Sequence, residues 1–362
     1  MVVCIVEDRL SEEVAVQFLL LSLTKHCPDL AIALFFPPAT AAFKHWCQSF
    51  PQIELRTTPV SNQQGWNVKA DALLQLLREG HQEVWWIDSD IILSRDFRPR
   101  LGVLAENTLV IAEEALYGMY RDQSYRARAW GFEIGQLLPF TLNTGVLRVT
   151  PCHLKVLEAW KSALESDRYR RAQTLPCGQK PFHLFGDQDV LTALLASQAF
   201  APIPLKILER GKDIIQYFGP AGYTLKERWH NLIHGLPPFI HCQREKPWHR
   251  SATPPPWRRF RSCLDYVRLE VSPYCFLARR YRAAIAPTRT LQWLNYHSLM
   301  GKFLAILGCG HPALTGLPIS LLYSLSRLYK KVKGIDDQFN PRQAYHQLQL
   351  REAIAVVSAE RS

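Results

Sequence analysis

The chain has 362 residues, of which 48% are hydrophobic and 21% charged, and this balance excludes a disordered chain and a protein with many membrane spans. Its formal net charge of +11 is uneven: residues 1–243 hold 24 basic and 25 acidic residues, a net of −1, and residues 244–362 hold 19 and 7, a net of +12. A main body that bound a polynucleotide would carry its own basic face, so the charge pattern predicts no nucleic-acid partner.

Nine cysteines occur without the close pairs that bind zinc, and an odd number does not form a closed disulfide framework. A reducing compartment is therefore expected. The first residues, MVVCIVEDRLSEE, show no basic leader and read as a strand, so we expect a cytoplasmic protein.

The first half of the chain alternates strand and helix patterns. An apolar run over 2–6 predicts a strand, and the helix after it is expected to begin at a Ser11 cap and to end near Lys25. Strands are predicted at 30–36 and 53–60. A helix capped by Asn67 follows and stops at a glycine. These bounds and the later ones come from the apolar pattern and the stop signals.

The alternation continues to about residue 245. The run Val-Trp-Trp-Ile over 84–87 is apolar on both faces, as in a parallel sheet covered by helices on each side. Further strands are predicted at 109–114, 141–149 and 239–242, and helices at 151–166 and 187–197. The pattern predicts an α/β protein with a mostly parallel sheet flanked by helices.

Acidic pairs follow three of the predicted strands, at Glu7–Asp8, Asp88–Asp90 and Glu113–Glu114. Ligands of such sheets bind at the carboxyl ends of the strands. Two carboxylates there suit a Mn²⁺ or Mg²⁺ ion that also binds substrate phosphates. The alternative is that the aspartates only cap the next turn.

Several segments resemble glycosyltransferase family 8, which includes glycogenin and lipopolysaccharide galactosyltransferases. WIDSDIIL (86–93) resembles the Asp-x-Asp segment of that family, and NVKADALL, LNTGVLRV, FGDQDVL and HCQREKPW stand in the family's order around it. The resemblance covers residues 1–248 and implies a GT-A (Rossmann-like) fold. The family pattern His-x-x-Gly-x-x-Lys-Pro-Trp is one residue longer than HCQREKPW and has a glycine that this chain lacks.

The resemblance implies a metal-dependent enzyme that moves a hexosyl group from a nucleotide diphosphate sugar, a UDP-sugar above all, to a glycan, lipid-linked or other hydroxyl acceptor, with retention. Metal ligands would be Asp88, Asp90 and His241, and the metal Mn²⁺ or Mg²⁺. The donor would be bound by Lys69, Asn143, Thr144, Gly145 and Lys246. Asp187, Gln188 and Asp189 would lie near the anomeric carbon. Asp8 is a further candidate for binding the nucleotide, only because it follows the end of the first predicted strand.

Each of these residues has a structural alternative. Asn143–Thr144–Gly145 reads equally as a turn or bulge, and Asp187 or Asp189 as a helix cap. His241 alone would be a hydrogen-bonded structural residue, and the lysines would be solvated charges. For the whole protein, the alternatives are a non-catalytic nucleotide-sugar-binding protein and an inverting transferase that uses Asp189 or Glu114 as base. A nucleotidyltransferase would need a Gly-rich loop after the first strand, which the segment VEDRLSEE lacks.

The C-terminal part has a different composition. A Pro/Arg-rich linker is expected at 249–262, a basic, amphipathic helical appendage at 263–340, and a tail at 341–362. Residues 303–326 lack Asp, Glu, Lys and Arg, but glycines and prolines within them favour two short helices over one membrane span. Residues 291–333 are a candidate surface for binding an anionic membrane, and the protein would then be peripheral at the cytoplasmic face. The alternative is that they form a helical bundle that packs on the catalytic domain.

Overall fold

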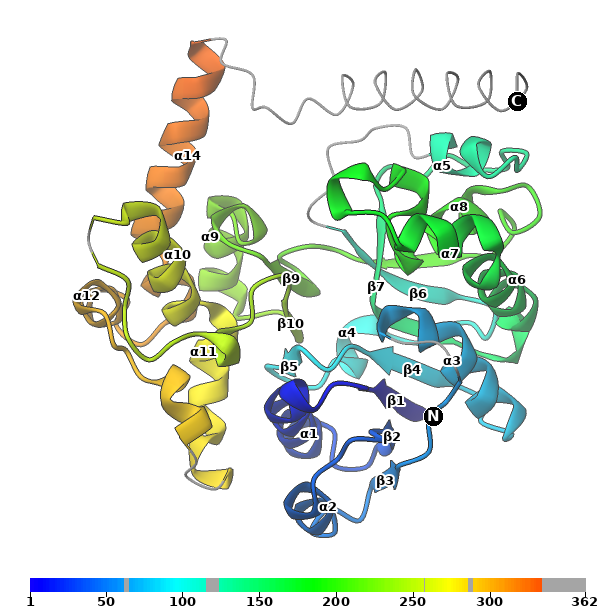
Figure 1. Ribbon diagram of the computed structural model, residues 1–362, viewed down its shortest axis with the longest axis horizontal. Coiled ribbons are helices and arrows are strands. Elements are labelled where there is room, and N and C mark those ends of the chain that lie inside the picture. Colours follow the sequence, from blue (N-terminus) through cyan, green and yellow to red (C-terminus); the bar gives the residue numbers. More distant parts are fainter. Residues whose placement is uncertain (62–64, 115–123, 257, 286–288, 334–362) are drawn as a thin grey trace.

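The computed structural model describes residues 1–61, 65–114, 124–256, 258–285 and 289–333. Two sheets and their helices form one part, and a group of helices at its side forms the other (Figure 1). The α/β fold class predicted from the sequence is confirmed. The division into domains at 249–262 stays a prediction, and the expected tail at 341–362 lies outside the described residues.

The large sheet is mostly parallel, as predicted. Within the described residues its strand order is β3-β2-β1-β4-β7-β6-β8, and only β7 runs antiparallel to its neighbours. Trp85 and Trp86 of β4 enter hydrophobic clusters on opposite faces of the sheet, which explains the unbroken apolar run. The strands are β1 (Val2–Val6), β2 (Ala31–Phe35), β3 (Ile53–Arg56), β4 (Val84–Ile87), β6 (Leu109–Glu113), β7 (Leu142–Val149) and β8 (Leu205–Leu208).

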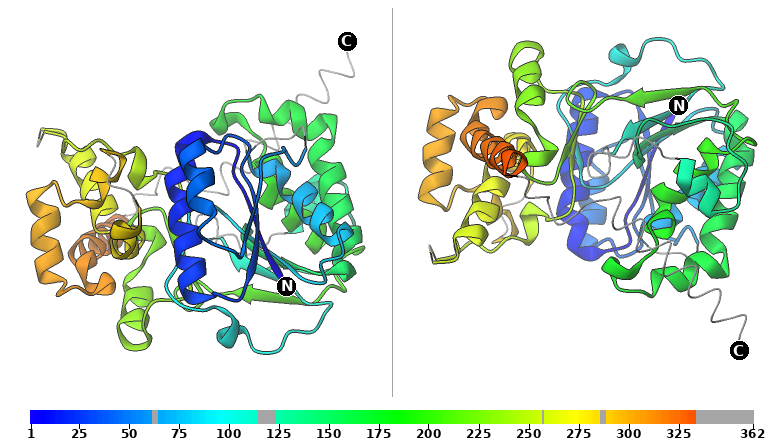
Figure 2. Two further views of the ribbon diagram at one scale, coloured as in Figure 1. Left: turned by 90° about the horizontal axis from the view of Figure 1, so that it is seen from below. Right: turned by 90° about the horizontal axis from the view of Figure 1, so that it is seen from above.

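Helices bury both faces of this sheet. Side chains of α1 (Glu13–His26) and α2 (Ala41–Cys47) complete the cluster on one face, and those of α3 (Lys69–Arg78), α6 (Leu154–Glu165) and α8 (Asp187–Ala196) complete the other. Figure 2 shows these layers from two further sides. The helices α4 (Arg98–Leu101), α5 (Ser124–Ala129) and α7 (Asp167–Gln173) lie beside this sheet, whereas α9 (Leu225–His234) lies beside the C-terminal helices (Figure 1).

Two predicted helix caps are wrong. Ser11 lies inside a short 3-10 turn, Leu10–Glu12, and its hydroxyl donates to the Glu12 carboxylate rather than capping α1. Asn67 also lies in a 3-10 turn, Gly65–Val68, and its Oδ1 accepts a hydrogen bond from Tyr169 Oη at 2.8 Å. In each case the added turn moves the α-helix start one or two residues on. The predicted stop of α3 is confirmed, since Gly80 has a φ of 99°.

A small second sheet has the order β5-β10-β9. Only β10 (Phe239–Cys242) was predicted, while β5 (Ile91–Leu93) and β9 (Ile214–Tyr217) were not. β10 pairs antiparallel with β5 and sets His241 opposite Ile91, one residue beyond Asp90. This pairing carries the histidine to the carboxyl end of β4.

Among the C-terminal helices, α11 (Pro273–Ala278) packs on β5 and β10 of the small sheet, and the others pack on α9, on α11 or on one another. Trp248 lies against Tyr274 and Trp293, with ring centroids 5.4 and 6.1 Å away, and Phe18 of α1 contacts Trp293. These helices are α10 (Phe260–Glu270), α11 (Pro273–Ala278), α12 (Leu299–Leu307), α13 (Pro312–Thr315) and α14 (Leu317–Val332). Two short helices were expected over 303–326, but three helices share this segment: the end of α12, the four-residue α13 and the first part of the 16-residue α14. Within the described part of the chain, no helix combines the length and apolar character needed to cross a membrane.

Candidate metal and donor site

The site is built on the tight turn Asp88–Ser89–Asp90 between β4 and β5. The amide of Ile91 donates to the carbonyl of Asp88 at 3.1 Å and closes the turn, and the amide of Asp88 donates to Gly145 O at 2.8 Å. The amide of Cys242 donates to the carbonyl of Asp90 at 3.0 Å. Each end of the turn is therefore held by a different neighbouring strand, β7 or β10.

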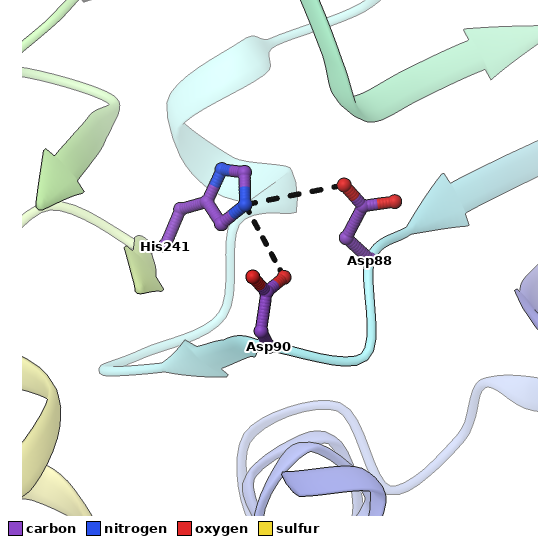
Figure 3. A group of neighbouring side chains, drawn as sticks. All are labelled: Asp88, Asp90 and His241. Atoms are coloured by element: carbon purple, nitrogen blue, oxygen red, sulfur yellow. Dashed lines mark ion pairs between the residues drawn. The ribbon is translucent and has the colours of Figure 1, made fainter. Parts of the chain in front are cut away.

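Three potential metal ligands converge there (Figure 3). One carboxylate oxygen each of Asp88 and Asp90 and a ring nitrogen of His241 lie within 4.8 Å of one another. His241 Nε2 is 3.2 Å from Asp90 Oδ1 and 3.9 Å from Asp88 Oδ2. Two carboxylates and one imidazole are a donor set that suits Mn²⁺. The spatial grouping is the one that the sequence predicted.

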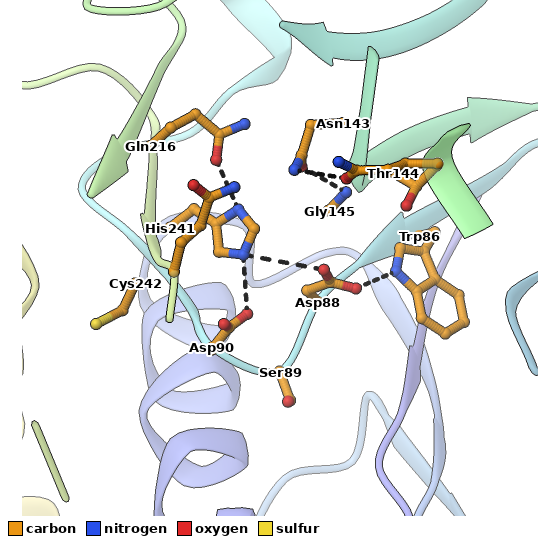
Figure 4. A network of polar contacts seen from close by, with 12 residues as sticks. Trp86, Asp88, Ser89, Asp90, Asn143, Thr144, Gly145, Gln216, His241 and Cys242 are labelled. Atoms are coloured by element: carbon orange, nitrogen blue, oxygen red, sulfur yellow. Dashed lines mark hydrogen bonds and ion pairs between the residues drawn. The ribbon is translucent and has the colours of Figure 1, made fainter. Parts of the chain in front are cut away.

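Gln216 of β9 orients the histidine, and sequence reasoning missed it. Gln216 Oε1 lies 2.7 Å from His241 Nδ1, and Gln216 Nε2 donates to Glu113 O at 3.1 Å (Figure 4). Because the amide oxygen can only accept, Nδ1 carries a proton, and Nε2 is the ring nitrogen that faces the two aspartates, where a metal would bind. The one available signal was a polar residue inside the apolar segment Ile-Ile-Gln-Tyr.

Two lysines balance the aspartates, Lys69 buried and Lys246 partly buried. Lys69 Nζ is 3.0 Å from Asp88 Oδ1 and 3.6 Å from Asp187 Oδ2, and Lys246 Nζ pairs with Asp90 and with the carbonyl of Cys242. Burial opposes the charge of both lysines, but the aspartates raise the pKa of each above its usual value. Burial likewise opposes ionisation of Asp90, yet Lys246 and His241 hold its pKa well below normal.

The segment Asn143–Thr144–Gly145 is a bulge in β7. The register against β6 shifts between Ile111 and Ala112, so extra residues of β7 face the site. Asn143 Oδ1 accepts from the amide of Gly145 at 2.9 Å, and Thr144 Oγ1 donates to Asp187 Oδ2 at 2.7 Å. The bulge predicted as the structural alternative is present, and it points Thr144 toward Lys69 and Asp187 and Asn143 toward Glu114 and Gln188.

A buried carboxylate, Glu114, collects the amide groups beside the bulge. Its Oε2 accepts from Asn143 Nδ2 at 2.7 Å, from Gln188 Nε2 at 3.1 Å and from Gln243 Nε2 at 3.5 Å. Asn143 Nδ2 also donates to Gln188 Oε1 at 3.1 Å. Asn143 and Gln188 thus belong to one hydrogen-bonded network, and sequence reasoning had considered Glu114 only as a base.

Asp189 and Asp8 lie apart from this network. Asp189 forms an ion pair with Arg126 at 2.8 Å, in which both side chains are fully buried, and its other oxygen accepts from the amide of Gly186. Burial raises the pKa of Asp189 to about 6, although Arg126 opposes this. Asp8 accepts from the amide of Gly65 at 2.6 Å, while its neighbour Glu7 accepts from Ser89 Oγ at 2.6 Å. Glu7 is therefore the first-strand acid that supports the Asp88–Asp90 turn.

The departure from the family pattern after His241 has a structural counterpart. Arg244 stands three residues after the histidine, where the family pattern has glycine, and its φ is 61°. A non-glycine residue in this left-handed region costs roughly 1–2 kcal/mol. The chain thus keeps the turn conformation without the glycine and still brings Lys246 to Asp90.

No protein-family model and no curated protein matches the chain. Similar solved structures are described as glycosyltransferases. They include the bifunctional glycosyltransferase WbbM (14% identity, TM-score 0.43, 68% of this chain and 46% of that one) and the galactosyltransferase LgtC with donor and acceptor sugar analogues (13%, 0.44, 79% and 100%). A third is GlyE of Streptococcus pneumoniae (14%, 0.40, 78% and 63%). This chain thus spans less than half of WbbM. Function has to be argued from the side chains of the site.

Proposed function

We propose that the protein is a metal-dependent glycosyltransferase that moves a hexosyl group from a nucleotide diphosphate sugar to a hydroxyl acceptor. The observation that carries this proposal is the meeting of Asp88, Asp90 and His241 at one point, with His241 oriented by Gln216. Mn²⁺ or Mg²⁺ at these ligands would supply a Lewis acid for the donor's phosphate oxygens.

Leaving-group stabilisation is the main chemical task of this reaction. The anomeric C–O bond breaks, its electron pair stays on the diphosphate oxygen, a bond forms to the acceptor oxygen, and the acceptor's proton passes to the departing diphosphate. Lys246, placed beside Asp90, is positioned to exchange that partner for the phosphates as their charge develops. The sugar hydroxyls would be held by the residues that lie next to the proposed metal ligands, namely Lys69, Asn143 and Asp187.

A retaining outcome is part of the proposal. An inverting transferase needs a carboxylate base that can reach the acceptor hydroxyl. Glu114 accepts from three amide groups, and Asp189 is paired with Arg126 in the interior. Both carboxylates are committed to neighbours, which supports retention, with Gln188 near the reacting carbon. A UDP-sugar donor and a glycan or lipid-linked acceptor are the substrates we expect.

The test measures donor binding and donor hydrolysis in Mn²⁺ with a panel of sugar nucleotides. We expect one donor to raise the melting temperature and to be hydrolysed slowly, because a ligand of the native state stabilises it. Asp88→Ala plus Asp90→Ala should abolish both effects. Asp167→Ala plus Asp265→Ala, two exposed aspartates, is the matched control. Hydrolysis that survives in the first double variant contradicts the site, and binding without turnover favours a non-catalytic sugar-nucleotide receptor.

A further inference from the structure

Helix α12 carries its apolar side chains on its outer face. Leu299 and Ile306 are 76% and 75% exposed, and Met300, Phe303 and Leu307 are exposed beside them. The inward face consists of Leu304, which is buried in a cluster with Val267 and Val271, and of Gly301 and Gly308, where an added Cβ atom would collide with Glu270 and Thr315. A surface helix of a globular protein normally buries its bulky apolar face. Here one leucine and two glycines face inward, and five bulky apolar residues of α12 face outward.

The outer half of α14 repeats this arrangement. Leu321, Leu322, Leu325, Leu328 and Val332 recur at helical spacing, and all are exposed, Val332 at 76%. Arg327 and Lys330 stand on the other side of the helix. We call these exposed apolar residues of α12 and α14, together with their flanking cations, the α12/α14 surface. Both helices lie on the side of the molecule away from the large sheet (Figures 1 and 2).

The segment that carries this surface has charged residues of one sign. Residues 271–333 contain nine Lys and Arg and no Asp or Glu. The acid just before them, Glu270, is fully buried and accepts from the amides of His297 and Ser298. The α12/α14 surface therefore has apolar groups beside cations such as Arg327 and Lys333, and the segment 271–333 contains no acidic residue. A second copy of the chain would set these cations against one another, so the charge disfavours self-association.

The exposure does not come from a loose appendage. Buried Arg228 of α9 donates to Ala313 O at 2.9 Å and to Ser320 Oγ at 2.9 Å, which fastens α13 and the start of α14. Arg250 lies 3.5 Å from Glu270 and donates to Trp293 O at 2.7 Å. The helices are thus anchored on their inner side, and their outer apolar side chains are held in place facing solvent.

We propose that the α12/α14 surface binds the interface of a bilayer that contains anionic lipid. Its leucines, Phe303 and Ile306 enter the boundary between headgroups and acyl chains, and Arg327 and Lys333 meet the lipid phosphates. The inference does not depend on glycosyl transfer. If the proposed function also holds, membrane binding brings the Asp88–Asp90 site to acceptors carried on lipid.

The experiment is flotation of the full-length protein with phosphatidylcholine vesicles, with and without about 30% phosphatidylglycerol, at physiological salt. We expect flotation with the anionic vesicles and much less with the neutral ones. Leu299→Ser plus Ile306→Ser, and separately Leu325→Ser plus Leu328→Ser, should each lower the bound fraction at least about tenfold. Arg327→Glu plus Lys333→Glu should lower binding to anionic vesicles only.

Matched controls are Val103→Ser plus Leu137→Ser, two exposed apolar residues elsewhere, and Arg170→Glu plus Arg171→Glu on α7. Both should float like the parent protein. All substituted residues are exposed, so the melting temperature should stay within a few degrees. Absence of flotation, or equal flotation of parent and serine variants, overturns the proposal. A dimer in solution that the serine variants dissociate would instead assign this surface to a protein partner.

Discussion

A Cβ atom added to Gly145 would lie 2.8 Å from Cε1 of His241 and 2.8 Å from Oδ1 of Asn143. The bulge of β7 and the imidazole on β10 are therefore in direct contact across the site. Only a residue without a side chain lets the histidine approach the aspartates while Asn143 keeps its bond to the amide of Gly145.

Gly145→Ala should damage the metal site first. The methyl group must displace the imidazole or the asparagine side chain, so we expect Mn²⁺ affinity to fall at least about tenfold and stability to fall by about 1–3 kcal/mol. Titration calorimetry with Mn²⁺ and thermal unfolding measure the two effects. Gly186→Ala is the control, because its nearest atom would be 3.9 Å away. Equal Mn²⁺ affinity in the two variants would refute the contact.

Gln216 should matter for metal binding although it is no ligand. Gln216→Leu leaves the ring N–H of His241 without an acceptor, so we expect Mn²⁺ affinity to fall roughly 10–100-fold. Gln216→Glu keeps an acceptor oxygen at that position and should retain most of the affinity. The comparison of the two variants by calorimetry separates orientation of the ring from loss of packing. If Gln216→Leu and Gln216→Glu bind Mn²⁺ with equal affinity, the hydrogen bond to His241 has no role in metal binding.

Lys246 should affect metal and donor in opposite directions. It neutralises Asp90 when no cation is bound, so Lys246→Met leaves a buried carboxylate uncompensated, and Mn²⁺ alone should bind several-fold more tightly. The same variant lacks a charge for the phosphates, so the proposed nucleotide diphosphate donor should bind at least about tenfold more weakly. Calorimetry with each ligand tests this. Weaker binding of both ligands would show that Lys246 only supports the fold.

His183 should make stability depend on pH. Its Nε2 accepts from Arg168 Nη2 at 2.8 Å, and burial, with Arg168 and Arg126 nearby, lowers its pKa to about 3. The unfolded chain, with a pKa near 6.5, then binds more protons than the native state between pH 6.5 and 3. The contribution of His183 to the free energy of unfolding is fully present above pH 6.5, and it is smaller by about 2 kcal/mol at pH 5.

Urea unfolding of the parent protein and of His183→Gln, at pH 7 and pH 5, measures this contribution. Glutamine keeps an acceptor for Arg168 but does not titrate in this range. The stability lost on acidification should therefore be about 2 kcal/mol smaller in the variant. Parallel losses in the two proteins would mean that His183 is not the group responsible.

Local patterns allowed much of the fold to be predicted. The apolar runs of β1, β2 and β4 and the amphipathic pattern of α6 lie in single short segments, so their neighbours in sequence suffice to define them. The two helix caps at Ser11 and Asn67 were wrong because a 3-10 turn competes with a cap at nearly equal local cost. Strands β5 and β9 were missed because each is short and is stabilised by pairing with β10, which is distant in sequence from β5.

From the sequence by itself we could predict the acidic pair Asp88 and Asp90, because two carboxylates directly after a buried strand stand out locally. His241, Lys69 and Lys246 became candidates only through the family resemblance, since each alone reads as a structural or solvated residue. Only the tertiary structure decided which groups orient them. Three features depend on contacts between strands and helices that are far apart in the chain: the hydrogen bond between Gln216 and His241, the amide groups gathered by Glu114, and the ion pair of Asp189 with Arg126. Hydrogen bonds need partners within about 3 Å, and the order of residues along the chain does not specify such distances until the sheets have formed.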